Sequence, residues 1–435
     1  MKKHIKPAFS LLIWFFLLLM FCGYFSYHNT AFLTIGAYSA FALSLIVLVL
    51  YGSTSNITHL LHSSWEKNKN LYITFLAYVL FLFISSYFFT YNNMRSDSIQ
   101  AVYEDIRYAI ILYIALFTLF ILKQDVAKNI LIILIVTLTM LCLIMPFKSY
   151  LAPLLVQGVP EPLYLAFRYG YVYPITLLFP CLLSSVSIFK QKWYLYYVIF
   201  LSIAIYSIVI LSGGRGSFLT ITAELILFLI YTYRAVSVKK MLLFIAVVTV
   251  ILVATISVIY HFNPTVHGKV DQSFLGNDFS SGRVAIIETR APIFFEHTSI
   301  LFGTGYGNKV YQQFLANHHA PEIIGRQEFE NHQKVFSYFH DEPQFLAVFY
   351  ESGIIGLVLF AMFVITFLLA CKKTANNNSF LGVLSIAIAF GIIGNTFVLG
   401  LVEHTSAKNL FLFCALLLTI GISSSTQTKT KNEAK

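Results

Sequence analysis

The stretch ILSGGRGSFLTI, residues 210–221, sets one arginine among glycines and serines between two runs of almost pure hydrocarbon. Similar runs recur along the chain, each about the 17–25 residues that cross a bilayer as a helix. Of the 435 residues, 58% are hydrophobic and only 11% are charged, whereas about a quarter of a soluble domain is charged. The composition therefore predicts an integral membrane protein of the all-α class.

We predict a polytopic transmembrane helical bundle of about twelve spans. The spans are expected near residues 8–27, 31–51, 71–90, 106–122, 128–146, 167–188, 192–212, 216–233, 240–261, 345–370, 379–400 and 407–423. Residues 1–261 would hold spans one to nine, and residues 345–435 would hold spans ten to twelve with a tail. Between them, residues 262–344 form one large outer loop with short helices, and a loop of that length is usually functional.

Lysine and arginine predict the orientation, because segments on the cytoplasmic side of a membrane are enriched in them. With the N-terminus inside, the inner segments hold 17 of the 29 Lys and Arg residues, and only Glu66, Asp125 and Glu433 among the acids. Both termini are therefore expected in the cytoplasm. The formal net charge of +10 follows mostly from this topology, so it implies no nucleic-acid partner.

Arg215 is the first candidate for binding a ligand, because it stands at the outer start of a predicted span. The flanking glycines allow close approach to the backbone, and an arginine beside a helix N-terminus favours an anion, above all phosphate. The alternative is an arginine that reaches up to lipid headgroups. Arg168, at the entrance of the span near 167–188, is a reserve candidate for the same anion site.

The outer loop contains a second basic segment, SSGRVAIIETRAPIFF, residues 280–295. Arg283 begins a predicted helix, and Arg290 follows two turns later on the same face. Two arginines on one face suit a diphosphate, although the helix alternatively lies on the membrane surface. The glycines of ILFGTGYGNKV, residues 300–310, follow no strand, so a plain turn is a simpler interpretation than a phosphate loop.

His340 lies beside Asp341 and Glu342 just before the tenth span. A histidine next to carboxylates can act as a general base near neutral pH, and the alternative is a surface or capping histidine. The other loop histidines show no HExxH pattern and the five cysteines have no ligand spacing, so no metal site is predicted.

In order and placement, these motifs resemble the O-antigen ligase and polymerase superfamily of bacterial inner-membrane glycosyltransferases. SGGRGSFL resembles the family's SRGA segment, and H…ESGIIGL resembles its HN…E-GIIG element. GRVAIIETRAPIFFEHTSILFGTGYGN resembles the family's run of arginine, amphipathic helix, proline and spaced glycines. The resemblance covers roughly residues 165–370 by motif and the whole chain by topology.

The resemblance implies a donor glycan on undecaprenyl diphosphate, transferred with inversion to a sugar hydroxyl at the periplasmic face of the inner membrane. A ligase uses lipid A–core as acceptor, and a polymerase uses another lipid-linked repeat unit. No cofactor, nucleotide or metal is implied, and the protein's surroundings are membrane lipids. Arg215 and Arg283 would be catalytic residues that bind the donor's diphosphate and stabilise its developing charge. His340 would be the catalytic base. Arg290 and Arg168 would bind substrate.

The sequence departs from the family pattern at the histidine. The family histidine precedes Asn, eleven residues before the glycine of E-GIIG, whereas His340 precedes Asp341 and stands thirteen before Gly353. Glu342 stands at the distance of eleven. We favour His340 as the base, because loop-to-helix junctions tolerate insertions. Asp341 or Glu342 would then orient His340 and contribute to substrate binding. The alternative is that Glu342 is the base.

Three functions are compatible with these residues. A ligase is favoured over a polymerase because GRVAIIETR is closer to the ligase form of that helix. A multispan transporter is a different class, in which Glu224 and Glu351, both within predicted spans, would line a path. A transporter is expected to carry ionisable groups near the midplane in both halves, and the first five spans carry almost none, which favours an enzyme.

Overall fold

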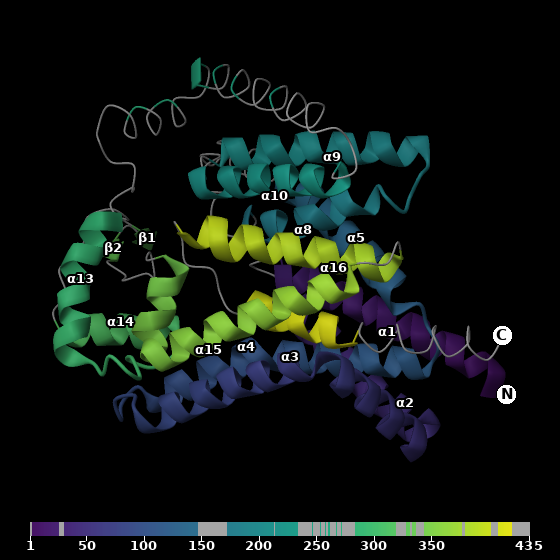
Figure 1. Cartoon of the computed structure of the whole chain (residues 1–435), viewed down its shortest axis with the longest axis horizontal. Helices are drawn as coiled ribbons and strands as arrows, with labels where there is room; N and C mark the ends of the chain where they lie inside the picture. The colour runs from purple at the N-terminus through teal and green to yellow at the C-terminus, as the bar shows by residue number, and fades with distance from the viewer. Residues whose placement is uncertain are drawn as a thin grey trace.

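A computed structural model describes most of the chain: residues 2–25, 30–146, 172–212, 214–233, 283–318, 328–330, 333–335, 343–375, 379–401 and 408–419, with single positions at 246, 253, 257, 260, 261, 267 and 271. These residues form a bundle of helices and one small two-stranded sheet (Figure 1). The all-α class is therefore confirmed for the described residues, with the small hairpin as an addition.

The helices follow the predicted spans in order. The first group is α1 (Lys2–Phe25), α2 (Thr30–Tyr51), α3 (Thr54–Phe88), α4 (Arg95–Ile121) and α5 (Val126–Pro146). The second group is α8 (Val172–Ser185), α9 (Lys192–Leu211) and α10 (Arg215–Tyr233). The predicted outer loop holds α13 (Arg283–His297), α14 (Asn308–Asn317) and the antiparallel strands β1 (Glu328–Glu330) and β2 (Gln333–Val335). The last group is α15 (Gln344–Thr374), α16 (Phe380–Ile393), a π-helical turn (Gly394–Val398), a 3-10 turn (Leu399–Leu401) and a helix at Lys408–Thr419.

Seven of the described helices are long and apolar enough to cross a membrane: α1, α2, α3, α5, α9, α15, and α16 with its π-helical turn. The shorter apolar helices are α8, α10 and Lys408–Thr419. α4 differs from the prediction, because it begins at Arg95 rather than near residue 106, and its added first turns carry charge. The predicted span near 240–261 lies outside the described residues except at single positions.

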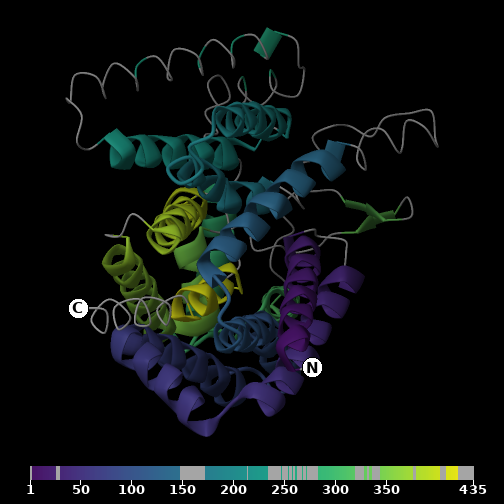
Figure 2. The same cartoon turned by 90° about the vertical axis from the view of Figure 1, so that its right-hand side faces the viewer.

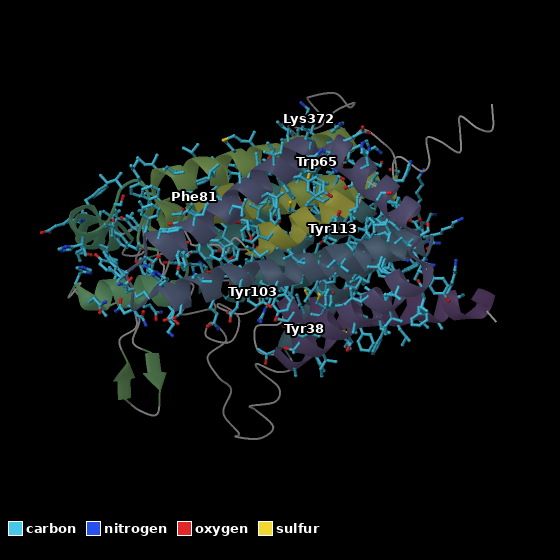
Figure 3. All side chains as sticks on the ribbon, turned by 90° about the horizontal axis from the view of Figure 1, so that it is seen from below. Tyr38, Trp65, Phe81, Tyr103, Tyr113 and Lys372 are labelled. Atoms are coloured by element: carbon cyan, nitrogen blue, oxygen red, sulfur yellow. The ribbon has the colours of Figure 1, made fainter. Side chains whose placement is uncertain are left out.

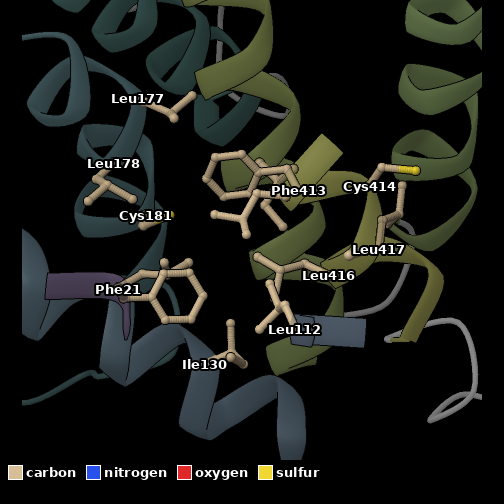
Figure 4. Packing of buried hydrophobic residues seen from close by; sticks show 14 of the residues in the cluster. Phe21, Leu112, Ile130, Leu177, Leu178, Cys181, Phe413, Cys414, Leu416 and Leu417 are labelled. Carbon is tan, nitrogen blue, oxygen red and sulfur yellow. The ribbon is translucent and has the colours of Figure 1, made fainter. Parts of the chain in front are cut away.

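The core joins helices that are distant in sequence. Figure 4 shows Phe21, Leu112, Ile130, Cys181 and Leu416, from α1, α4, α5, α8 and the helix Lys408–Thr419, gathered in one cluster. Each of these side chains is 0% exposed. Because lipid is as apolar as the core, close packing rather than exclusion of water holds such helices together.

Contacts between distant segments agree with the predicted sides of the membrane. Lys373 donates to the carbonyl of Lys67 at 3.3 Å, which joins two segments predicted to lie inside. Lys309 pairs with Asp97 at 2.8 Å, which joins two segments predicted to lie outside. Figure 1 places α13 and α14 at the end of the bundle opposite the start of α1.

The helices near the N-terminus and those around α9 occupy opposite edges. Figure 2 shows α9 and α10 along one edge and α2 and α3 along the other, with α16 between them. Figure 3 shows Tyr38 and Tyr103 at the surface of α2 and α4, where they are 44% and 53% exposed. Exposed aromatic rings of this kind suit a surface that faces lipid and its headgroups.

Candidate functional site

Arg215 is the first residue of α10, as predicted. The turn before it is closed by Ser212, whose hydroxyl accepts the N–H of Gly214 at 3.2 Å, while the Gly214 carbonyl accepts the N–H of Phe218 at 3.0 Å. The N–H groups in the first turn of a helix lack intrahelical acceptors and carry the positive end of its dipole. The backbone at Arg215 therefore has the form of an anion site. The Arg215 side chain lies outside the described part of the structure.

The second basic segment forms α13, so Arg283 and Arg290 share one helix, as predicted. Arg283 is its first residue, and its side chain lies outside the described part. Arg290 is buried, with 3% exposed. Its Nη1 donates to the hydroxyl of Tyr311 on α14, and its guanidinium lies 5.6 Å from the centre of that ring. Arg290 thus joins α13 to α14, which the sequence spacing does not reveal.

The joint between α13, α14 and α15 is aromatic. The Phe294 ring stacks on Tyr350 with ring centres 3.9 Å apart, and on Phe314 at 4.8 Å. All three side chains are buried. Aromatic pairs of this kind contribute about 0.5–1.5 kcal/mol beyond the area they bury. The described helices of the outer loop are therefore packed onto the start of α15.

α15 is broken at Gly353, whose φ of 66° and ψ of −169° are not helical. Only glycine adopts this conformation readily. In an unbroken helix, Ile354 would donate its N–H to the Tyr350 carbonyl and Ile355 to the Glu351 carbonyl. Both carbonyls and both N–H groups have partners elsewhere, in the glycine-rich segment 299–307.

Four hydrogen bonds join that segment to α15: Thr304 N–H to the Tyr350 carbonyl at 2.9 Å, Gly305 N–H to the Glu351 carbonyl at 3.0 Å, Ile354 N–H to the Ile300 carbonyl at 2.9 Å and Ile355 N–H to the Leu301 carbonyl at 3.3 Å. The glycines allow this contact, since a Cβ on Gly303 would lie 2.6 Å from the backbone of Glu351. The segment does contain a turn, as expected, since the N–H of Gly303 donates to the Ser299 carbonyl at 2.8 Å. The sequence did not reveal that this turn is bonded to α15. The N–H groups of Thr304 and Gly305 are also engaged by α15 rather than by a phosphate.

The two glutamates within predicted spans have different surroundings. Glu351 is 4% exposed, and its Oε1 accepts the N–H of Gly307 at 3.1 Å. Gly307 is the N-cap of α14, so this carboxylate meets the positive end of a helix. Glu224 of α10 is fully buried, and neither carboxylate oxygen has a hydrogen-bond partner among the described residues. It packs against Gly394, where an added Cβ would lie 2.2 Å from its Oε1.

Asp105 of α4, whose side chain is half-buried, forms a polar cluster with the glycine-rich segment. Tyr306 donates its hydroxyl to Asp105 at 2.6 Å and its N–H to the Ser98 hydroxyl at 2.8 Å. Burial raises the pKa of Asp105 to about 6, although the Tyr306 hydrogen bond and the charge of Lys408 lower it. No motif in the sequence indicated this cluster. The only signal was an acidic residue next to a predicted span.

The remaining predicted site residues lie outside the described residues: Arg168, His340, Asp341 and Glu342. The last three directly precede Pro343, the N-cap of α15. Within the described part of the chain, no group of three or more His, Cys, Asp or Glu side chains is placed to hold a metal ion.

The fold and these contacts define a multispanning membrane protein in which α13, α14 and the glycine-rich segment pack on a broken apolar helix. A family model described as O-antigen ligase matches residues 197–361, from α9 to the middle of α15. The predicted resemblance is thus confirmed over these residues, which are similar to the O-antigen ligase family. No curated protein matches the chain.

Proposed function

We propose that this protein is an O-antigen ligase, which transfers a glycan from undecaprenyl diphosphate to a sugar hydroxyl of lipid A–core. The observation that carries the proposal is that the family segment, residues 197–361, contains two arginines that each begin a helix. Arg215 begins α10, and Arg283 begins α13 in the outer loop. A helix N-terminus with an arginine is suited to a diphosphate.

In the proposed reaction, the acceptor hydroxyl attacks the anomeric carbon of the donor from the side opposite the diphosphate. The new C–O bond forms as the bond between the anomeric carbon and the diphosphate oxygen breaks, and the anomeric centre inverts. Arg215 and Arg283 stabilise the charge that develops on the leaving diphosphate. His340 takes the hydroxyl proton. The diphosphate leaves as a stable anion, so it needs no proton.

Four further residues complete the proposed substrate contacts. Asp341 or Glu342 orients His340, and Glu342 is the alternative base. Arg290 of α13 adds positive charge near this site, and its guanidinium is held by the Tyr311 hydroxyl of α14. Arg168 would contribute from the start of the sixth span.

The proposed organisation follows from the same topology. Residues 1–261 form spans one to nine, residues 262–344 form the periplasmic loop, and residues 345–435 form spans ten to twelve and a cytoplasmic tail. The protein would lie in the inner membrane, with both termini in the cytoplasm. The donor would enter laterally from the membrane, because its polyprenyl chain is soluble only there.

A lipopolysaccharide gel tests the function. Cells that lack the gene are complemented with the wild type or with His340→Ala. For a ligase, the deletion leaves core-only lipid with polymer accumulated on the polyprenyl carrier, and only the wild type restores the ladder. Core that carries a single repeat unit would instead establish the polymerase of the same family. A ladder that the deletion does not change would contradict both and favour the transporter.

A further inference from the structure

We propose that Glu351 is a positioning residue of the transfer site, which fixes the outer-loop helices on the broken span α15. The inference rests on the proposed function, because it assigns a role in the same site. It does not place Glu351 in contact with the reacting atoms. Its function would be to hold α13 and the first part of α15 at a fixed position relative to each other.

Glu351 binds the glycine-rich segment 299–307 twice. Its main-chain carbonyl, freed by the break at Gly353, accepts the N–H of Gly305 at 3.0 Å. Its side-chain Oε1 accepts the N–H of Gly307 at 3.1 Å. Both bonds are buried, so a lost acceptor would leave a buried donor without a partner, which is costly.

The residue between these two glycines is held from the opposite side. Tyr306 is bonded to Ser98 and Asp105 of α4, at 2.8 and 2.6 Å. Residues 305–307 are therefore clamped between α4 and α15. The segment packs closely at this point, since a Cβ on Gly305 would lie 2.2 Å from the Thr90 hydroxyl oxygen.

Two arms extend from this clamp. One is α13, which ends at His297, directly before the segment, and which carries Arg283 at its far end. The other is the first part of α15, which begins at Gln344, four residues after His340. The clamp is where these two segments meet, so it would set the distance between Arg283 of the proposed diphosphate site and the proposed base. A misplacement of about 1 Å in such a site lowers the rate about 100-fold.

The test compares Glu351→Ala, Glu351→Gln and Asp97→Ala in purified, reconstituted protein. Glu351→Ala should lower kcat about 100-fold with little change in the KM for the lipid-linked donor. Glu351→Gln should recover most of the activity, because its amide oxygen still accepts the Gly307 N–H. Asp97→Ala is the matched control, since Asp97 contacts the same helix α14 through Lys309 at the surface. It should behave as the wild type.

Hydrogen–deuterium exchange of peptides that cover residues 299–309 supplies a readout that needs no activity. Exchange should be faster in Glu351→Ala and unchanged in Glu351→Gln and Asp97→Ala. If the wild type transfers no glycan, the proposed function fails, while exchange still tests the clamp. Wild-type exchange in Glu351→Ala would overturn the proposal, and so would equal loss of kcat in the Ala and Gln variants.

Discussion

The arginines of the candidate site illustrate how surroundings decide what a charge does. Arg290 is buried and bonded to Tyr311, so its guanidinium stabilises the contact between α13 and α14. Arg215 instead begins a helix after a glycine-containing turn. A guanidinium at such a position has a fork of donors for an anion and a favourable helix dipole beside it.

Arg215→Ala is therefore expected to lower glycan transfer by at least about 100-fold, because it removes stabilisation of the leaving diphosphate. Arg215→Lys should retain part of the activity, since an ammonium keeps the charge but not the bidentate geometry. Transfer is measured in membranes with equal amounts of inserted protein. Arg95→Ala, which removes another outer arginine, bonded to Asn92, is the control. Full activity of Arg215→Ala would remove this residue from the site.

Asp105 determines part of the pH dependence of stability. Burial raises its pKa in the folded protein to about 6, from an ordinary value of 3.8. A raised carboxyl pKa means that its contribution to stability is complete below pH 3.8 and is lost as the pH rises through about 6. The difference corresponds to stability on the order of 3 kcal/mol.

Asp105→Asn should therefore raise the melting temperature at pH 7 and flatten its dependence on pH between 4 and 7, as measured by thermal unfolding in detergent. The amide still accepts the Tyr306 hydroxyl, so the contact is retained. Tyr306→Phe is the companion variant. It removes a hydrogen bond that lowers the pKa of Asp105. The fall of the melting temperature with rising pH should therefore occur at higher pH than in the wild type. An Asp105→Asn protein with the wild-type pH profile would refute this account.

At the scale of elements, the break in α15 and the glycine-rich segment form one structure. Gly353 cannot be replaced without strain, because its φ is 66° and an added Cβ would lie 2.3 Å from the backbone of Leu301. The unfavourable backbone conformation alone costs about 1–3 kcal/mol, and the clash adds to it.

Gly353→Ala should lower the melting temperature and abolish glycan transfer, because α15 would either release segment 299–307 or straighten. The neighbouring Ile354→Ala changes a side chain that is 45% exposed, and it serves as the control. Both variants are measured by thermal unfolding and by transfer. Wild-type stability of Gly353→Ala would show that the break is not required.

At the scale of the whole molecule, the predicted topology has a direct chemical test. Lys309 lies on α14 in the outer loop, and Lys372 lies at the other end of α15, near Trp65 (Figure 3). A membrane-impermeant thiol reagent should label Lys309→Cys in intact cells and Lys372→Cys only after the inner membrane is opened. Four native cysteines are buried and Cys22 is half-buried, so the background should be low. The reverse pattern would invert the proposed topology.

The sequence predicted the spans well where hydrophobicity alone decides them. α1, α2, α9 and α10 begin and end within a few residues of expectation, apart from the start of α1. The predicted span for α4 was too short, because the first turns of the helix carry charged residues. Ser98 and Asp105 in these turns are hydrogen-bonded to Tyr306. Arg215 and Arg283 were correctly expected at helix starts, since glycine and serine before an apolar run are local signals.

From the sequence alone, the membrane class, the order of the helices and the family segment could be predicted, and the sides of the membrane were expected from the same pattern. These follow from local hydrophobicity, from the placement of lysine and arginine, and from short motifs. Only the tertiary structure decided that Glu351 caps α14, that Tyr306 meets Asp105 and that segment 299–307 completes a broken helix. These bonds join residues 44 to 201 positions apart. A one-dimensional pattern carries no record of such partners, because they are selected by the packing of all the helices together.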